Sequence, residues 1–169
     1  MIAHRLTTLQ RVGARGLPFF MLRMDRAGQV SKRYAGASAS ALVESAGRCP
    51  LWRVHHAFDR PDDFVRQLVE LENGERWLTI ARTVRPQVRG PSGLRAEFAV
   101  GLGIAAEHAA TLAAARGLDL TGVGATPIGL GCHACARADC PQRAAPPAGR
   151  ALLLNDRERG LTPFTFVGD

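Results

Sequence analysis

The sequence lacks any apolar run of the roughly 18 residues that a membrane-spanning helix needs. Its first residues, Met1 to Gln10, contain no apolar segment followed by a small-residue cleavage site, so they do not resemble a signal peptide. We therefore expect a cytoplasmic chain that makes no contact with a membrane. Its 169 residues are enough for one hydrophobic core, and residues 1–169 are expected to form a single domain.

The signatures of several common enzyme classes are also missing. The chain has no Gly-x-Ser-x-Gly, no Gly-x4-Gly-Lys phosphate loop and no His-Glu-x-x-His. Glu72 and Glu75 fall in an expected turn and suit solvated charges. His133 lies between two cysteines, but no other residue supports a reactive-thiol enzyme. We expect that the chain is not an enzyme.

Lysine is almost absent, since Lys32 is the only one among 22 lysines and arginines, and the formal net charge is +7. A GC-rich genome explains an excess of arginine without any function. A basic domain also suits a polyanionic partner, either nucleic acid or a phosphorylated ligand. Because the arginines are spread along the chain, we favour the compositional explanation, and charge alone does not identify a ligand.

Apolar patterns and turn signals predict five strands, over 17–24, 29–34, 64–71, 76–84 and 94–103. Two turns, Asp25-Arg-Ala-Gly28 and Glu72-Asn-Gly-Glu75, join neighbouring strands, which should therefore pair antiparallel. Helices are expected over 2–11, around 41–46 and over 104–116. The predicted fold class is α+β, an antiparallel sheet of about five strands with flanking helices, which is the pattern of small sensor domains of the PAS/GAF type. Phe164 and Phe166 should pack the terminal segment onto the core.

Three of the four cysteines lie within nine positions, as Cys132-His-Ala-Cys135-Ala-Arg-Ala-Asp-Cys140. In a cytoplasmic chain such spacing favours a metal or cluster site over disulfides. Thiolates are soft ligands that suit zinc or iron–sulfur clusters, and Cys140 is followed by proline, as ligands of ferredoxin-type clusters often are. Gly129 and Gly131 allow backbone N–H groups to come close to sulfur.

The spacing leaves the metal and the fourth ligand open. Structural zinc usually takes four ligands in two close pairs, whereas here one close pair is joined by one more distant cysteine. An iron–sulfur cluster is our first choice, zinc the second and unmetallated thiols the third. Cys49, which is also followed by a proline, is the candidate fourth ligand. A cluster with three protein thiolates and one exogenous ligand is the alternative.

Two cysteine-bearing motifs resemble the hallmarks of the short-chain fatty acyl regulators. One is Arg48-Cys-Pro-Leu-Trp52 followed by His56-Ala-Phe58, and the other is Gly131-Cys-His-Ala-Cys-Ala-Arg-Ala-Asp-Cys-Pro-Gln-Arg143. The hairpin Phe19 to Arg33 also matches. The resemblance extends over nearly the whole chain, so we identify it as similar to this family throughout.

The resemblance implies a regulator of three parts. An XRE-type helix-turn-helix binds DNA, an IrrE-like segment follows, and a C-terminal domain senses a short acyl-CoA derived from propionate or acetate. That last domain can hold a [4Fe-4S] cluster, here through Cys132, Cys135, Cys140 and Cys49. Only the last part is expected here, so DNA would be a partner only through the missing N-terminal domain. A homodimer is possible, because regulators of near-symmetric sites are usually dimers.

One departure from the family bears on the fourth ligand. Ile104 stands where many members have a cysteine after Leu-Gly. If that cysteine is a ligand in the family, Cys49 or a non-protein ligand must replace it here.

CoA carries a 3′-phosphate and a pyrophosphate, which need arginines or backbone N–H groups, and a pantetheine arm that needs an apolar groove. Residue types that match this chemistry are Arg48, Trp52, Arg53, His56, Arg82 and Arg143. Core packing is the favoured explanation for Trp52, and a solvated surface is the simpler one for any single arginine. Arg143 can instead neutralise the negative charge of a cluster. The alternative function is a zinc-stabilised interaction module without a small ligand.

Overall fold

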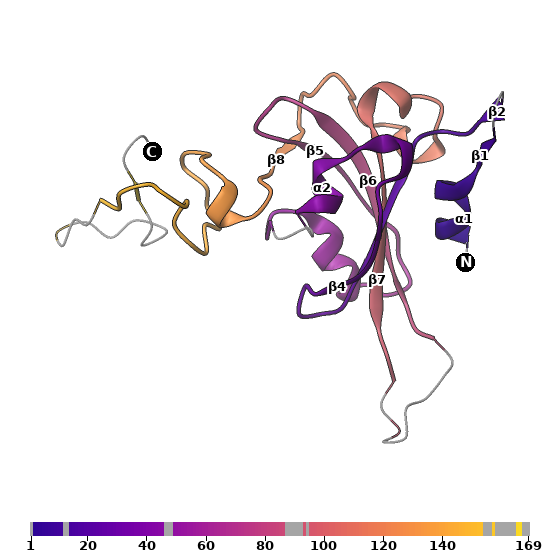
Figure 1. Ribbon diagram of the computed structural model, residues 1–169, viewed down its shortest axis with the longest axis horizontal. Coiled ribbons are helices and arrows are strands. Elements are labelled where there is room, and N and C mark those ends of the chain that lie inside the picture. Colours follow the sequence, from indigo (N-terminus) through magenta and orange to yellow (C-terminus); the bar gives the residue numbers. More distant parts are fainter. Residues whose placement is uncertain are drawn as a thin grey trace.

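The computed structural model describes residues 2–11, 14–45, 49–86, 93, 95–153, 157 and 165–166. The strands of the main sheet are β3 (Phe20–Met24), β4 (Val30–Tyr34), β5 (Val65–Glu70), β6 (Arg76–Val84), β7 (Phe98–Ala105) and β8 (Thr126–Pro127). They lie in the order β4-β3-β7-β6-β5-β8, and β1 (Gln10–Arg11) pairs with β2 (Ala14–Arg15) in a separate small hairpin. Two short α-helices, α1 (Ile2–Thr8) and α2 (Ala41–Glu44), lie on opposite sides of the sheet (Figure 1). Within these residues, no helix is long and apolar enough to cross a membrane.

The predicted α+β class is confirmed, and five antiparallel strands form where the sequence pattern places them, with ends that shift by a few residues. The sheet differs from the prediction by one strand. β8 pairs parallel to β5, with Val69 opposite Thr126 and Glu70 opposite Pro127, so the sheet has six strands and is mixed. A two-residue strand that contains a proline shows no alternating pattern, and for that reason the sequence did not reveal it.

The expected helix over 104–116 is wrong. β7 continues to Ala105, which pairs with Trp77 of β6, and the chain then passes through two 3-10 turns, η3 (Ala106–His108) and η4 (Ala113–Ala115). The helix propensity of alanine exceeds that of most other residues by at most about 0.7 kcal/mol per residue. Tertiary packing overrides so weak a preference. Here Ala109 and Ala115 are buried against the sheet. The helices expected over 2–11 and 41–46 are present in shorter form.

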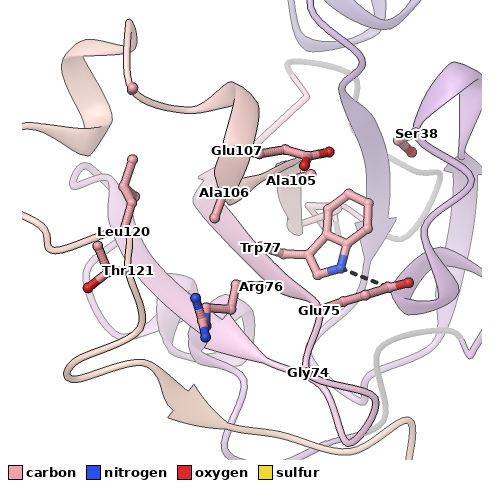
Figure 2. Close-up of a pocket in the computed structure, with 11 residues that line it drawn as sticks. Ser38, Gly74, Glu75, Arg76, Trp77, Ala105, Ala106, Glu107, Leu120 and Thr121 are labelled. Carbon is pink, nitrogen blue, oxygen red and sulfur yellow. Dashed lines mark hydrogen bonds between the residues drawn. The ribbon is translucent and has the colours of Figure 1, made fainter.

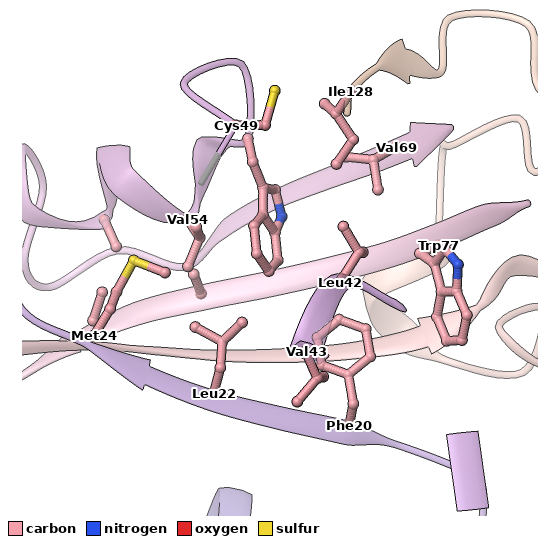
Figure 3. Packing of buried hydrophobic residues seen from close by; sticks show 14 of the residues in the cluster. Phe20, Leu22, Met24, Leu42, Val43, Cys49, Val54, Val69, Trp77 and Ile128 are labelled. Carbon is pink, nitrogen blue, oxygen red and sulfur yellow. The ribbon is translucent and has the colours of Figure 1, made fainter. Parts of the chain in front are cut away.

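Side chains along the strands alternate between the two faces of the sheet, and each face carries a core. The larger core lies under α2 and the 3-10 turn η2 (Arg53–Phe58). Its members include Phe20, Leu22, Met24, Leu42, Val43, Cys49, Trp52, Val54, Val69, Trp77 and Ile128 (Figure 3). The smaller core is made by Phe19, Leu78, Ile104, Ala109 and Ala115. A Cβ at Gly103 would overlap the ring of Phe20, so glycine is required where that ring lies on β7.

Residues 128–150, which we call the cysteine loop, leave the sheet beside β5 (Figure 1). The loop is anchored at its start, because Ile128 is fully buried and its N–H donates to the Glu70 carbonyl at 2.9 Å. Phe166 is buried as predicted, although its ring meets Arg143 of this loop. Phe164 lies outside the described residues. The loop therefore sits at the β5 edge, next to the larger core.

Candidate cysteine site

The four cysteines line one small cavity, which we call the cysteine cavity. It has a volume of about 20 Å³, room for about one water molecule, and its walls include Cys49, Cys132, Cys135 and Cys140. Cys49 and Cys135 are buried, Cys132 and Cys140 are half-buried, and none is in a disulfide. The fold therefore brings Cys49 to the three cysteines of the loop, although it lies far from them in sequence.

The geometry of the loop explains how Cys132 and Cys135 come to face the same way. Cys132–Ala134 form a single 3-10 turn, η5, in which the Cys135 N–H donates to the Cys132 carbonyl at 3.3 Å. In a 3-10 turn the side chains three residues apart lie on the same side. His133 points elsewhere, and its Nδ1 lies 3.0 Å from the Pro146 carbonyl oxygen. Gly131 begins the turn at a φ of 121°, which side chains with a Cβ rarely adopt.

Backbone N–H groups are directed at three of the four sulfur atoms. The Ala144 N–H donates to Cys132 Sγ at 3.4 Å. N–H groups of Gly129 and Leu51 donate to Cys49, and that of Arg137 donates to Cys135. Such donors stabilise negative sulfur and tune the potential of clusters. The expectation for Gly129 is thus confirmed, and a Cβ at this position would overlap the Cys135 sulfur.

Burial controls the protonation of the two inner thiols. It raises the pKa of Cys49, against the lowering effect of the N–H donors, and the nearby Cys140 and Cys132 raise it further. Burial likewise raises the pKa of Cys135, which the Arg137 N–H lowers and the Glu72 carboxylate raises. Both thiols are therefore protonated at neutral pH in the free chain, and metal binding must release their protons.

Glu72 is a residue that the sequence analysis assigned to solvent but that belongs to this site. Its Oε1 accepts a hydrogen bond from the Ala136 N–H at 2.8 Å, and its carboxylate also contacts Cys135. The two segments are 64 residues apart in sequence, and nothing in a turn motif such as Glu-Asn-Gly-Glu indicates a contact over that distance. Only the packing of the loop against the β5–β6 turn reveals it.

Two arginines fasten the loop to itself and to the sheet, and both line the cysteine cavity. Arg143 is only 5% exposed, donates to the carbonyls of Cys135 and Arg137, and lies 4.7 Å from the centre of the Phe166 ring. Arg137 donates to the carbonyls of Ile128 at 3.2 Å and Glu70 at 2.8 Å. The position of Arg143 suits charge neutralisation at a cluster better than capture of an exposed phosphate.

The four thiols around one cavity are soft donors of the kind that zinc and iron–sulfur clusters take. Among the residues that the structure describes, no three His, Cys, Asp or Glu side chains are close enough together to hold one metal ion. Zinc needs all its thiolates at about 2.3 Å from one centre. A cluster holds its thiolates farther apart, on separate irons, so four thiols around a common cavity with N–H donors suit it.

Ile104, the departure from the family pattern, does not face the cysteine cavity. Its side chain is 1% exposed and belongs to the smaller core, on the other face of the sheet from Cys49 and Ile128. A cysteine at this position in the present backbone would lie apart from the other thiols.

The residues matched to CoA chemistry are not brought together. Trp52 is 1% exposed, its indole N–H donates to Thr79 Oγ1 at 3.1 Å, and its ring packs edge-on against Phe20. Core packing, the favoured explanation for Trp52, is thus confirmed. Arg53 and His56 are exposed on η2.

The two remaining arginines of that set lie elsewhere. Arg82 projects from the opposite face of the sheet to its buried neighbour Ala81, with its guanidinium 5.2 Å from the centre of the Phe64 ring. Arg48 lies outside the described residues. The sequence therefore suggested residue types for a ligand site without locating one.

A shallow hollow of about 640 Å³ lies between the β5–β6 turn and η3. Trp77 forms one wall, and its indole N–H donates to Glu75 Oε2 at 3.3 Å (Figure 2). The charges around it are mixed, because Glu75 and Glu107 lie there with Arg76, which pairs with Glu70 at 3.0 Å. Such a lining favours no particular class of ligand.

Comparison with known proteins gives a consistent result. A family model described as "Short-chain fatty acyl coenzyme A regulator, C-terminal" matches residues 8–164. The "Propionyl-CoA carboxylase regulator" of Cereibacter sphaeroides is 43% identical over 166 residues, which are 98% of this chain and 36% of that protein. The "HTH-type transcriptional regulator RamB" of Mycobacterium tuberculosis is also 43% identical over 166 residues, 96% of this chain and 35% of that protein.

A third relative and a solved structure agree with these. The "HTH-type transcriptional regulator PrpR" of Mycobacterium tuberculosis is 38% identical over 165 residues, 97% of this chain and 34% of that protein. A solved "Mycobacterium tuberculosis transcriptional regulator" superposes with a TM-score of 0.90 at 38% identity, over 97% of this chain and 50% of that one. The chain thus spans about a third of the length of the curated relatives it matches.

Proposed function

Because the chain belongs to the short-chain fatty acyl coenzyme A regulator family, whose C-terminal region it matches, we propose that it is the effector-binding domain of a bacterial transcription regulator. In this proposal the domain serves short-chain fatty acid metabolism, binds CoA or a short acyl-CoA and holds a [4Fe-4S] cluster. Two of its relatives are named as HTH-type transcriptional regulators and the matching family is one of regulators, which confirms the expectation that the chain is not an enzyme. In the same proposal, another segment of the regulator binds DNA. The regulator acts in the cytoplasm, as a homodimer.

The observation that carries the cluster part of the proposal is the shared cavity of four thiols. Cys49, Cys132, Cys135 and Cys140 would hold the cluster, and Arg143 beside them would balance its negative charge. When bound, the cluster supplies either a redox-active centre or a covalent tie between the loop and the larger core. The chain's own residues contribute N–H donors to sulfur and a mostly buried setting, which disfavours loss of the cluster to solvent.

The sensing part of the proposal rests on the family match and on the form of the sheet. Five antiparallel strands with helices on both faces support the PAS/GAF-type interpretation. For a signal to pass, the effector must bind two states of the regulator with different affinity. We propose that the bound domain packs differently against the rest of the regulator.

Anaerobic purification followed by metal analysis tests the cluster. We expect a broad absorption band near ~400 nm and about four irons per chain. Cys135→Ser should abolish the band, whereas His133→Ala, whose ring faces Pro146, should retain it. Stoichiometric zinc without iron or sulfide in the anaerobic protein would overturn the cluster and favour a zinc-stabilised interaction module.

Calorimetric titration tests the effector. Propionyl-CoA should bind the purified chain with measurable heat, and acetyl-CoA and free CoA serve as comparison ligands. If none of the three compounds binds, the chain is not the CoA sensor that we propose.

A further inference from the structure

The turn between β5 and β6, residues 71–75, presents a carboxylate to the cysteine loop. Leu71 anchors this turn, because its side chain is only 3% exposed and belongs to the larger core. The Leu71 N–H donates to the Glu75 carbonyl at 2.9 Å, and the Gly74 N–H donates to the Leu71 carbonyl at 3.0 Å. Because these bonds fix the backbone of the turn, the hairpin determines the point from which the Glu72 side chain leaves it.

The carboxylate of Glu72 lies against the segment that carries Cys135. Its Oε1 accepts a hydrogen bond from the Ala136 N–H at 2.8 Å. The carboxylate is also hydrogen-bonded to the Cys135 side chain. Its Oε2 lies 3.7 Å from the position that a Cβ on Gly129 would take, and the Cys135 sulfur lies 2.4 Å from that same position. A negative charge is therefore held beside the sulfur of a proposed cluster ligand.

The charge of Glu72 is not neutralised by an ion pair. Between described residues, the ion pairs involve the carboxylates of Glu70, Glu97 and Glu107, and none involves Glu72. Arg143 is the nearby charge of opposite sign, and it is directed at the backbone, where it donates to the carbonyls of Cys135 and Arg137. The field of Glu72 at the Cys135 sulfur is therefore opposed by Arg143 from within the loop but is not cancelled by direct contact.

A fixed charge beside an iron–sulfur cluster changes its reduction potential. Reduction adds an electron to a centre that already carries negative charge, so a neighbouring carboxylate disfavours the reduced form. At contact distance this effect is substantial, although Glu72 is exposed and water screens part of it. We expect one such charge to change the equilibrium constant for reduction by about tenfold.

We propose that Glu72 holds the cluster in its oxidised form by placing a negative charge against the Cys135 sulfur. The inference rests on the proposed function and adds to it a residue outside the cysteine motifs. A cluster that resists reduction is better suited to joining the cysteine loop to the larger core than to transferring electrons. The β5–β6 turn would in this way favour a structural role for the cluster over a redox role.

Redox titration of the anaerobically purified 169-residue chain tests the inference. The band near ~400 nm, followed at controlled potentials, reports the reduction of the cluster. Glu72→Gln keeps an oxygen for the Ala136 N–H and removes the charge. Reduction should become about tenfold more favourable, a positive shift of about 59 mV for one electron. Glu72→Lys should shift the potential further in the same direction.

Glu75→Gln is the matched control. It removes the same charge from the same turn, but the Glu75 carboxylate accepts the Trp77 indole N–H at 3.3 Å and does not line the cysteine cavity. It should change the equilibrium constant for reduction by less than about twofold. Iron and sulfide analysis of each variant checks that the cluster is present before its potential is measured.

The outcomes separate this inference from the proposed function. If the unaltered chain holds no iron and sulfide, the proposed cluster fails, and the inference fails with it. If the cluster is present but the unaltered chain, Glu72→Gln and Glu72→Lys have the same potential, or none of them is reduced by excess reductant, the inference is wrong and the cluster stands. If Glu72→Gln holds no cluster, Glu72 has a structural role and the inference is also wrong.

Discussion

Trp52 is fixed in the larger core by its hydrogen bond to Thr79 Oγ1 and by its edge-on contact with Phe20. Residue type alone fits both a ligand-stacking ring and a core ring, and its exposure of 1% decides for the core. Arg143 also fits two roles by residue type, binding a phosphate or balancing the charge of a cluster. Its burial beside the thiols favours the second role. For both residues, burial decides between two roles that the residue type alone allows.

Trp52→Phe should lower the free energy of unfolding by about 1–3 kcal/mol, because a buried hydrogen bond and part of a ring are lost. Urea unfolding followed by circular dichroism measures this change. The neighbouring exposed Arg53 provides the control, and Arg53→Ala should stay within about 0.5 kcal/mol of the unaltered chain. Equal stability of Trp52→Phe and the unaltered chain would contradict the packing role.

Glu97 offers a pH test at the same scale. Hydrogen bonds from Arg26 at 2.7 Å and from Arg85 at 2.8 Å hold the pKa of its carboxyl below the ordinary value of 4.5. Because the folded-state pKa is depressed, the stabilisation is present above the unfolded pKa and is lost as pH falls through the folded value. The melting temperature should therefore drop on acidification below about pH 4.5 by more in the unaltered chain than in Glu97→Gln. The effect should be small, since the pair is largely solvated, and identical pH profiles would exclude it.

At the scale of elements, strand positions follow directly from the sequence. Alternating side chains and the Asn-Gly turn placed β5 and β6 within one residue of their observed ends. Residues 104–116 do not form the predicted helix, because a run of alanines has a helical preference but no apolar stripe that would pack a helix onto the sheet. The first residues of that segment, up to Ala105, belong instead to β7, which pairs with β6.

The absence of a helix there can be tested with glycine. Ala110 is exposed and lies between η3 and η4. In a helix interior, Ala→Gly costs about 1 kcal/mol, whereas Ala110→Gly should change the free energy of unfolding by less than about 0.5 kcal/mol. If urea unfolding shows a loss of about 1 kcal/mol in the free energy of unfolding, Ala110 lies in a helix and the structure is wrong at this segment.

The close approach of β3 and β7 can be tested at Gly103. A methyl group there meets the Phe20 ring in the larger core, so Gly103→Ala should destabilise the fold by about 1–3 kcal/mol through overpacking. Gly74→Ala is a partial control, because its Cβ would meet no atom and only its left-handed φ of 84° would be strained. The double variant Gly103→Ala with Phe20→Leu should regain part of the lost stability, because the smaller side chain leaves room for the methyl group. If it regains none, a change in the backbone at Gly103, and not the clash with Phe20, causes the loss.

At the scale of the whole molecule, the sheet and the cysteine loop depend on different forces. The sheet has a core on each face, whereas the loop is tied down mainly by Ile128, Arg137, Arg143 and the Glu72 carboxylate. A cofactor bound by Cys49 and the loop cysteines would join the two parts. Stability should consequently differ along the chain.

Cofactor removal should therefore open the loop before the sheet. In limited proteolysis of chelator-treated protein, we expect the first cuts within 128–150, with the segment from β3 to β7 still intact. Anaerobically loaded protein should resist cleavage there, and Cys135→Ser should behave like the treated sample whether or not metal is supplied. Equal loop protection in loaded and treated protein would show that the cofactor does not hold it.

The sequence by itself determined the α+β class, the five antiparallel strands, the family and the suitability of Cys132, Cys135 and Cys140 as soft ligands. These follow from short-range regularities: side-chain alternation, turn residues and the spacing of thiols. Tertiary structure alone decided that Cys49 and Glu72 meet those cysteines and that Trp52 is a core residue. Each of these depends on contacts between segments far apart in the chain, which packing and register set and which no local pattern encodes.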